Sequence, residues 1–210
     1  MGRDIGPKDR QSRRIGDKLF LKGARDLSPK SAIVKRPYPP GMHGPKMINK
    51  KISEYGRQLM AKQKIKKMYR LRERQFRNYF NEASKMKGDA SNNLLTLLEN
   101  RFDNTIYRIG LADSRDQARQ LVTHAHLQVN GKKVKVPSYR MKQNDKITIK
   151  DKSKENSYFK NVVNQISGKD IPEWIDYDKE TQTAMVVGYP STLELNLGQD
   201  ATLTVEFYSR

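Results

Sequence analysis

The chain has 210 residues with 42 Lys and Arg against 23 Asp and Glu, so its formal net charge is +19. A compact chain with this excess of positive charge repels itself, which indicates a polyanionic partner, most commonly nucleic acid. A basic face that is merely solvated is disfavoured, since solubility needs a net charge of only about 2 to 8. The absence of cysteine excludes disulfides and thiolate chemistry and suits a reducing cytoplasm, and no apolar run approaches the ~20 residues of a membrane span.

The first 52 residues have weak periodicity and many chain breakers, and we expect an extended basic arm there. Residues 36–45 contain four prolines, which lack the N–H donor and fix φ, so this stretch is predicted to be neither a helix nor a ladder strand. Such a segment can lie along a phosphate backbone. A disordered arm in the free protein is the alternative interpretation, and the two are compatible.

Residues 53–98 have helical patterns. Ser53 is a predicted N-cap with Glu54 in the first turn, and Met68 and Tyr69 mark the buried side of the helix that it opens. We expect that helix to carry seven cations, which repel one another unless an anion lies opposite: Lys62, Lys64, Lys66, Lys67, Arg70, Arg72 and Arg74. A second helical repeat is interpreted as core first and as base-stacking groups second: Phe76, Tyr79, Phe80 and Ala83. Gly88 is expected to end it.

Residues 94–109 have an amphipathic pattern that predicts one continuous helix, ended at the glycine that follows. Ser114 and Gln117 then form a predicted capping box for a further helix. On that helix Arg115 and Arg119 are four residues apart, and we expect them on its exposed side.

The hydrophobic period then changes from 3.6 to 2. Alternating apolar residues at 127/129, 134/136 and 147/149 predict three short strands, with a strong hairpin turn at Asn130-Gly131 and Lys132 and Lys133 at its tip. Two small helices followed by this sheet predict a compact α+β module. A helix is predicted after it at residues 159–166, and further strand pieces at residues 184–187, 193–197 and 203–207.

No catalytic motif is present in the sequence. A zinc site needs about four N or S ligands, and His43 has no such company, whereas structural or phosphate contacts are expected of His124 and His126. The triplet Arg101-Phe102-Asp103 is similar to the Arg-Leu-Asp motif of pseudouridine synthases, but the 56 residues after residue 154 are too few for their catalytic domain. We therefore predict no enzymatic activity. An RNA-modifying enzyme and a free regulatory RNA-binding protein remain the alternatives.

Positive charge is concentrated before residue 155. The net charge is +17 over residues 1–90, +8 over residues 101–154 and −5 over residues 155–210. We therefore expect RNA contacts from the first two regions. The third region is expected to face solvent, protein or the basic regions themselves.

A series of short motifs resembles the bacterial family of small-subunit ribosomal protein S four, in family order over essentially the whole chain. The motifs are LFLKG at residues 19–23, RPYPPGMHG at 36–44, ERQFRN at 73–78, LLE at 97–99 with DN at 103–104, QARQLV at 117–122, VNG at 129–131, PSY at 137–139 and EFYSR at 206–210.

The resemblance implies an α+β fold: a mainly helical N-terminal domain completed by the C-terminus, with an inserted small α+β RNA-binding module of two helices and a short antiparallel sheet. We assign residues 1–52 to the extended basic arm and residues 53–98, completed by about 199–210, to the helical rRNA-binding domain. Residues 99–198 form the predicted inserted domain, whose RNA-binding module covers about 99–152.

The resemblance also implies a structural component of the small (30S) ribosomal subunit in the cytoplasm. Members of the family bind 16S ribosomal RNA at a helix junction in the 5′ domain and nucleate assembly of the subunit body. They contribute to translational accuracy with ribosomal protein S five near the mRNA entrance. We therefore expect 16S rRNA, ribosomal protein S five and mRNA as partners, and neither a membrane nor a small-molecule substrate.

Many relatives bind zinc through four cysteines in the N-terminal arm. The corresponding positions here are Asp9, Ser12, Asp26 and Ser31, a poor zinc ligand set, so we expect no cofactor. Phosphate contacts are expected to position RNA that is recognised by its shape. The expected RNA-contacting residues are Arg3, Lys8, Arg10, Arg13, Arg14, Lys22, Arg36, His43, Lys62, Lys64, Lys66, Lys67, Tyr69, Arg70, Arg72, Arg74, Arg77, Arg115, Arg119, Lys132, Lys133, Tyr139 and Arg140.

Overall fold

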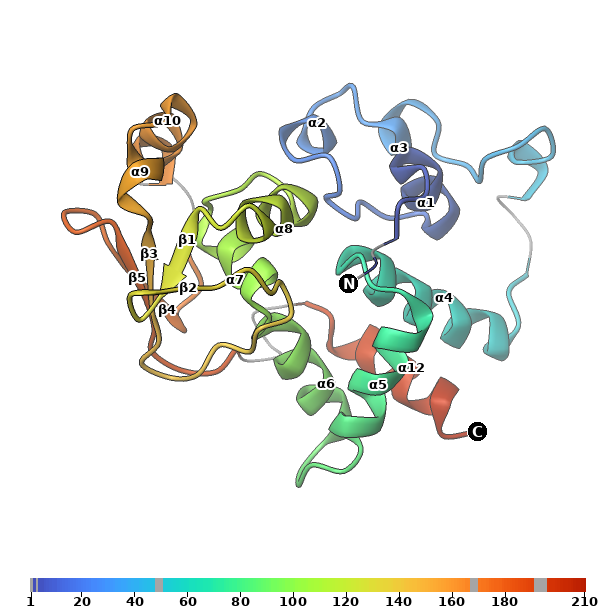
Figure 1. The fold of residues 1–210 in the computed structure, drawn as a ribbon. Coiled ribbons are helices and arrows are strands. Elements are labelled where there is room, and N and C mark those ends of the chain that lie inside the picture. Colours follow the sequence, from blue (N-terminus) through green and yellow to red (C-terminus); the bar gives the residue numbers. More distant parts are fainter. Residues whose placement is uncertain (1, 3, 48–50, 167–169, 191–195) are drawn as a thin grey trace. The chain divides into compact units, whose positions relative to one another are not determined.

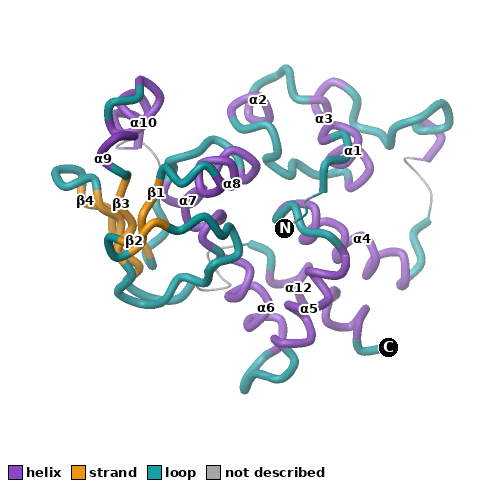
Figure 2. The backbone as a smooth tube through the Cα atoms, viewed as in Figure 1, coloured by secondary structure: helices purple, strands orange, loops and turns teal. Residues whose placement is uncertain are grey.

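The computed structural model describes residues 2, 4–47, 51–166, 170–190 and 196–210. The chain divides into two compact units: residues 1–94 with 196–210, called unit 1, and residues 95–195, called unit 2. Among the described residues, the strands all lie in unit 2, whereas unit 1 is helical (Figures 1 and 2). The expected α+β class, with a helical N-terminal part and a small antiparallel sheet, is confirmed.

The N-terminal segment of unit 1 contains more helix than the extended arm that we expected. Its helices are α1 (Lys8–Ile15), α2 (Ala24–Leu27), α3 (Ala32–Lys35) and the 3-10 helix η1 (Pro45–Met47). α1 ends at Ile15, and the following residue, Gly16, has a left-handed φ of 82°, which glycine adopts without steric cost. Residues 36–44 contain neither helix nor strand, as predicted, but Pro45, the last residue of the predicted stretch, begins η1.

The rest of unit 1 consists of α4 (Glu54–Met68), α5 (Glu73–Ala83), the first half of α6 (Ala90–Glu99) and the C-terminal helix α12 (Gly198–Tyr208). The predicted N-cap of α4 is confirmed, because the Ser53 hydroxyl accepts the Gly56 N–H at 3.2 Å. α4 ends before Arg70, so the last three of its seven expected cations lie beyond it. α5 ends at Ala83, earlier than the expected stop at Gly88.

α12 packs along α4 and brings the C-terminus of the chain into the core of unit 1. Ala201 and Thr204 of α12 are fully buried, and the Tyr208 ring stacks on Phe80 of α5 at a centroid distance of 4.7 Å. The strand predicted at residues 203–207 is therefore wrong. Its alternating apolar side chains are only partly buried, whereas residues 201, 204 and 208 share the helical face that packs. Of the piece predicted at 193–197, residues 193–195 lie outside the described residues.

Unit 2 combines helices with one five-stranded antiparallel sheet of order β2-β1-β3-β5-β4 (Figure 1). Its helices are the second half of α6, α7 (Phe102–Ile109), α8 (Arg115–Thr123), α9 (Asp151–Lys154) and α10 (Ser157–Ile166). Its strands are β1 (Leu127–Val129), β2 (Lys132–Lys133), β3 (Lys146–Ile149), β4 (Ile175–Asp178) and β5 (Thr183–Val186).

The helices and the sheet of unit 2 share one hydrophobic core. Phe102 of α7, Val122 of α8 and Leu127 of β1 are fully buried in it, and Phe159 of α10 is nearly so. The predicted Asn130-Gly131 turn is confirmed, since both residues have positive φ angles, 50° and 73°, as a tight two-residue hairpin requires. The second strand lies earlier than predicted: β2 is formed by Lys132 and Lys133, which we placed at the hairpin tip, and residues 134–136 contain no strand.

The single helix that we predicted over residues 94–109 is two helices, α6 and α7, separated at residues 100 and 101. The backbone there pairs with a distant segment instead of continuing the helix. The Phe102 N–H donates to the Tyr139 carbonyl, and the Met141 N–H donates to the Asn100 carbonyl, both at 2.8 Å. An amphipathic repeat does not reveal such a break, because it contains no information about hydrogen bonds to a segment forty residues away.

Candidate nucleic-acid interface

Three of the four lysines on α4 are neutralised by acidic residues of the same unit. Lys62 and Lys66 both donate to the Glu73 carboxylate, at 2.8 and 2.7 Å. Lys64 lies between the carboxylates of Asp17 and Asp200, at 2.7 and 2.8 Å. Our expectation that a bound anion must lie opposite all of these cations is therefore wrong, since residues distant in sequence already supply the negative charge.

The pKa values follow this pairing. Burial alone would raise the pKa of Glu73, but hydrogen bonds from Lys62, Lys66 and the Tyr208 hydroxyl outweigh it and lower the pKa to about 2. Burial alone would lower the pKa of Lys64, but Asp17 and Asp200 outweigh it, so that pKa lies above its usual value. These groups are charged at neutral pH, and their ion pairs hold α4, α5 and α12 together.

Several residues near α1 that we expect to contact RNA form bonds within the N-terminal segment. The Arg13 guanidinium donates to the carbonyls of residues 36, 38 and 39 at 3.2, 3.0 and 3.4 Å, and it lies 4.8 Å from the centre of the Tyr38 ring. Lys8 donates to the Leu21 carbonyl at 2.9 Å, and Lys22 pairs with Asp9 at 2.7 Å. Arg13 therefore fixes the shape of residues 36–45, called the proline-rich loop.

Other predicted residues of unit 1 divide into buried and exposed groups. Tyr69 and Arg70 are buried. Arg70, just after α4, donates to the side chain of Gln11 on α1 at 3.0 Å, so this bond joins the end of α4 to α1. Arg3 lies outside the described residues. The exposed members of the predicted set are Arg10, Arg14, Arg36, His43, Arg72, Arg74 and Arg77.

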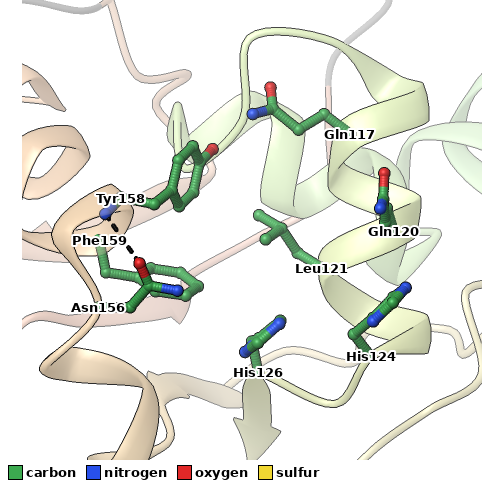
Figure 3. Close-up of a pocket in the computed structure, with 8 residues that line it drawn as sticks. All are labelled: Gln117, Gln120, Leu121, His124, His126, Asn156, Tyr158 and Phe159. Carbon is green, nitrogen blue, oxygen red and sulfur yellow. Dashed lines mark hydrogen bonds between the residues drawn. The ribbon is translucent and has the colours of Figure 1, made fainter.

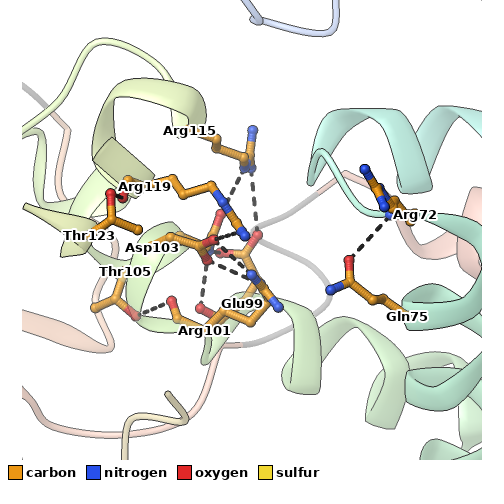
Figure 4. Close-up of polar contacts among 10 residues, drawn as sticks. Arg72, Gln75, Glu99, Arg101, Asp103, Thr105, Arg115, Arg119 and Thr123 are labelled. Atoms are coloured by element: carbon orange, nitrogen blue, oxygen red, sulfur yellow. Dashed lines mark hydrogen bonds and ion pairs between the residues drawn. The ribbon is translucent and has the colours of Figure 1, made fainter. Parts of the chain in front are cut away.

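In unit 2 the prediction that Arg115 and Arg119 lie on an exposed side is wrong, because each is only 7% exposed. Arg119 donates to Asp103 at 3.2 Å (Figure 4). Arg115 donates to the Asn104 side chain at 2.8 Å. The same Asp103 carboxylate receives two bonds from the buried Arg101 at 3.0 and 2.7 Å. Asp103, which resembled a catalytic aspartate in sequence, is thus a buried ion-pair residue.

Several exposed cations of unit 2 lie at the β2 edge of the sheet and in the segment that follows it. Lys132 and Lys133 form β2 itself and are exposed, as is Arg140, whereas Tyr139 is partly buried with its ring edge-on to Phe102. Three further exposed lysines, which we did not predict as RNA contacts, lie in this segment and at the start of β3: Lys135, Lys142 and Lys146. The positive balance of residues 101–154 was the signal that indicated them.

The two histidines after α8 line an open pocket of about 230 Å³ between α8 and α10 (Figure 3). Burial, followed by the nearby His124 and Lys150, lowers the pKa of His126, whose Nδ1 lies 3.0 Å from the Ser153 hydroxyl. The other lining residues are three with side-chain amides, one leucine and two aromatic residues: Gln117, Gln120, Leu121, Asn156, Tyr158 and Phe159. His126 therefore has a structural contact, as we expected.

A metal site and a membrane-spanning helix are both absent from the described residues. No group of three or more His, Cys, Asp or Glu side chains in the described part of the chain could hold a metal ion. Among the described helices, none is long and apolar enough to cross a membrane. Unit 1 and unit 2 each carry cationic side chains, on well-packed helices and on a sheet edge. Cationic side chains are the groups that bind phosphate.

Comparison with known proteins identifies the family. Residues 3–99 match the family model "Ribosomal protein S4/S9 N-terminal domain", and residues 101–147 match the "S4 domain". The chain is 47% identical to the small ribosomal subunit protein uS4 of Caldicellulosiruptor saccharolyticus, 48% to that of Clostridioides difficile and 45% to that of Thermus thermophilus, over 100% of each chain. With family models matched over residues 3–99 and 101–147 and full-length identity close to one half, the chain belongs to the uS4 family of small ribosomal subunit proteins.

Proposed function

We propose that this chain is a structural component of the small ribosomal subunit that binds 16S ribosomal RNA at a helix junction in the 5′ domain. The full-length identity to uS4 proteins is the observation that carries the proposal. In this role it nucleates assembly of the subunit body and contributes to translational accuracy with ribosomal protein S five near the mRNA entrance. It is not an enzyme, since uS4 proteins are structural proteins of the ribosome.

A set of exposed basic residues supplies the RNA contacts in this proposal. In unit 1 they lie on α1, in the proline-rich loop and on α5, and in unit 2 they lie around β2. They are Arg10, Arg14, Arg36, His43, Arg72, Arg74, Arg77, Lys132, Lys133, Lys135, Arg140, Lys142 and Lys146. The buried cations on α4 and α8 keep the binding surface in shape.

Domain limits are proposed as residues 53–98 with 199–210 and an inserted domain at 99–198.

A binding measurement tests the proposal. The chain is expected to bind a 5′-domain rRNA fragment and to sediment with the small subunit. Reversing Arg74 and Arg77 to Glu should weaken that binding more than about tenfold and reduce the slope of log K against log salt by about two, one per phosphate contact. The matched control reverses Lys160 and Lys179, which are exposed in the acidic third of the chain, and should leave the slope unchanged.

Two outcomes would contradict these statements separately. A wild-type chain that is absent from small subunits and fails to bind the fragment would overturn the structural ribosomal role. A wild-type chain that binds while the Arg74/Arg77 variant keeps the full salt slope would overturn only the contacts proposed on α5.

We also propose that the N-terminal segment folds without zinc. At the four positions where relatives have cysteine, the Asp9 carboxylate is paired with the Lys22 ammonium at 2.7 Å, and Asp26 accepts the Lys22 N–H at 2.8 Å. The other two positions, Ser12 and Ser31, offer neutral hydroxyls, which are weak ligands for zinc beside the thiolates and imidazoles that it prefers. Lys22 thus ties together two positions that a metal joins in those relatives.

Metal analysis checks this proposal. The purified protein is expected to contain far less than one zinc per chain, and a chelator should leave its helical circular dichroism unchanged. Tightly bound zinc at one equivalent, released by the chelator together with helix, would show that Asp9 and Asp26 are ligands after all.

A further inference from the structure

Unit 1 contains a cavity of about 340 Å³ that is lined by three cations. Its lining residues are Arg10, Gln11 and Arg14 of α1, Pro40 and Gly41 of the proline-rich loop, and Lys67 of α4. The loop wall has a fixed shape, because a side chain at Gly44 would collide with the Pro39 carbonyl and because Arg13 holds three loop carbonyls. The cavity is therefore a built feature of unit 1.

Lys67 differs from the other lysines of α4. Lys62, Lys64 and Lys66 each pair with a carboxylate, whereas Lys67 has no ion pair among the described residues. The Asp4 carboxylate, whose charge acts to raise the pKa of Lys67, bonds to other groups: Oδ1 accepts the Gly6 N–H at 2.9 Å and Oδ2 accepts the Gln11 side-chain amide at 3.0 Å. Burial, together with the charges of Lys66 and Arg14, lowers the pKa of Lys67. The cavity thus has uncompensated positive charge.

The two arginines increase this imbalance. Within the part of the chain that the structure describes, neither Arg10 nor Arg14 has an ion pair, and both are exposed at the cavity rim. Two guanidinium groups and one ammonium around a single cavity repel each other, and an anion bound among them would remove that repulsion. Phosphate is the anion whose oxygens match several such donors at once.

We propose that this cavity binds one phosphodiester group of the ribosomal RNA, with Lys67, Arg10 and Arg14 as its ligands. The inference rests on the proposed function and adds to it a single defined phosphate site. Gln11 is a positioning residue, since its side-chain amide accepts from Arg70 and donates to the Asp4 carboxylate.

The test compares neighbouring lysines of one helix. Lys67→Met removes the unpaired charge and should reduce the salt slope of binding to the 5′-domain rRNA fragment by about one, with a roughly tenfold loss of affinity at low salt. Lys66→Met makes the same charge change one residue away, where the lysine is paired with Glu73, and should leave the slope unchanged. Lys67→Arg keeps the charge and should keep the slope.

Each alternative has its own outcome. If the wild-type chain binds the fragment and Lys67→Met, folded by circular dichroism, keeps the wild-type slope, the phosphate site is wrong and the proposed function stands. If the wild-type chain does not bind, the proposed function itself fails. Inorganic phosphate is titrated in a separate experiment. If phosphate saturates the chain below about 1 mM while the salt slope of RNA binding does not depend on Lys67, the cavity is a small-anion site and the RNA assignment is wrong.

Discussion

Replacing Glu99 by alanine should lower the free energy of unfolding of unit 2 by about 3 kcal/mol. The Glu99 side chain is fully buried, and its carboxylate accepts two bonds from Arg108 and one from the Asn104 amide, all at 2.8 Å. Its removal leaves these donors without their acceptor inside the protein. The loss lies at the lower end of what a broken buried ion pair costs, because the Arg108 side chain is 25% exposed and retains some contact with water.

The only tryptophan of the chain reports on this change. Trp174 is 3% exposed in the core of unit 2, so its fluorescence in urea follows the unfolding of that unit. Glu155→Ala, at an exposed position of the same unit, is the matched control and should keep the wild-type midpoint. If Glu99→Ala and Glu155→Ala unfold at the same urea concentration, the buried network does not stabilise unit 2 in the way described.

The parts of the fold that were predicted correctly depend on local patterns. Phe76, Phe80 and Ala83 are buried as their helical spacing indicated, and the Asn130-Gly131 turn follows from residues that tolerate positive φ. The segment at residues 203–207 failed because its alternation is compatible with a strand. Its packing on α4 decides in favour of a helix, and that contact joins residues more than 130 positions apart.

The candidate interface was predicted less well, because a count of charges does not identify their partners. Lys64 looks like its neighbour Lys67 in the sequence, yet Lys64 is bound by Asp200 at the other end of the chain and Lys67 is not. Arg119 was placed on a surface by spacing alone, and only the fold shows that Asp103 of the preceding helix covers it. Separating free cations from paired ones therefore requires the three-dimensional structure.

A chain that ends at residue 197 should lose the cooperative unfolding of unit 1 and its affinity for the rRNA fragment. α12 contributes fully buried residues to that unit, and its Tyr208 stacks on Phe80 and donates to Glu73 at 2.7 Å. It also supplies Asp200 to Lys64. Exposing several large apolar side chains costs about 1.5 to 3 kcal/mol each, which together approaches the 5 to 15 kcal/mol that stabilises a typical domain.

Two readouts separate this effect from general damage. The helical circular dichroism of unit 1 should melt without a defined midpoint in the truncated chain, while the urea midpoint of Trp174 in unit 2 stays at its wild-type value. The matched control removes only residues 209 and 210, which follow the helix and are exposed, and should melt like the wild type. A truncated chain that keeps both its melting transition and its RNA affinity would show that α4 and α5 form a stable unit alone. The packing of α12 along α4 argues against that outcome, because without α12 the surface of α4 that it covers would be open to water.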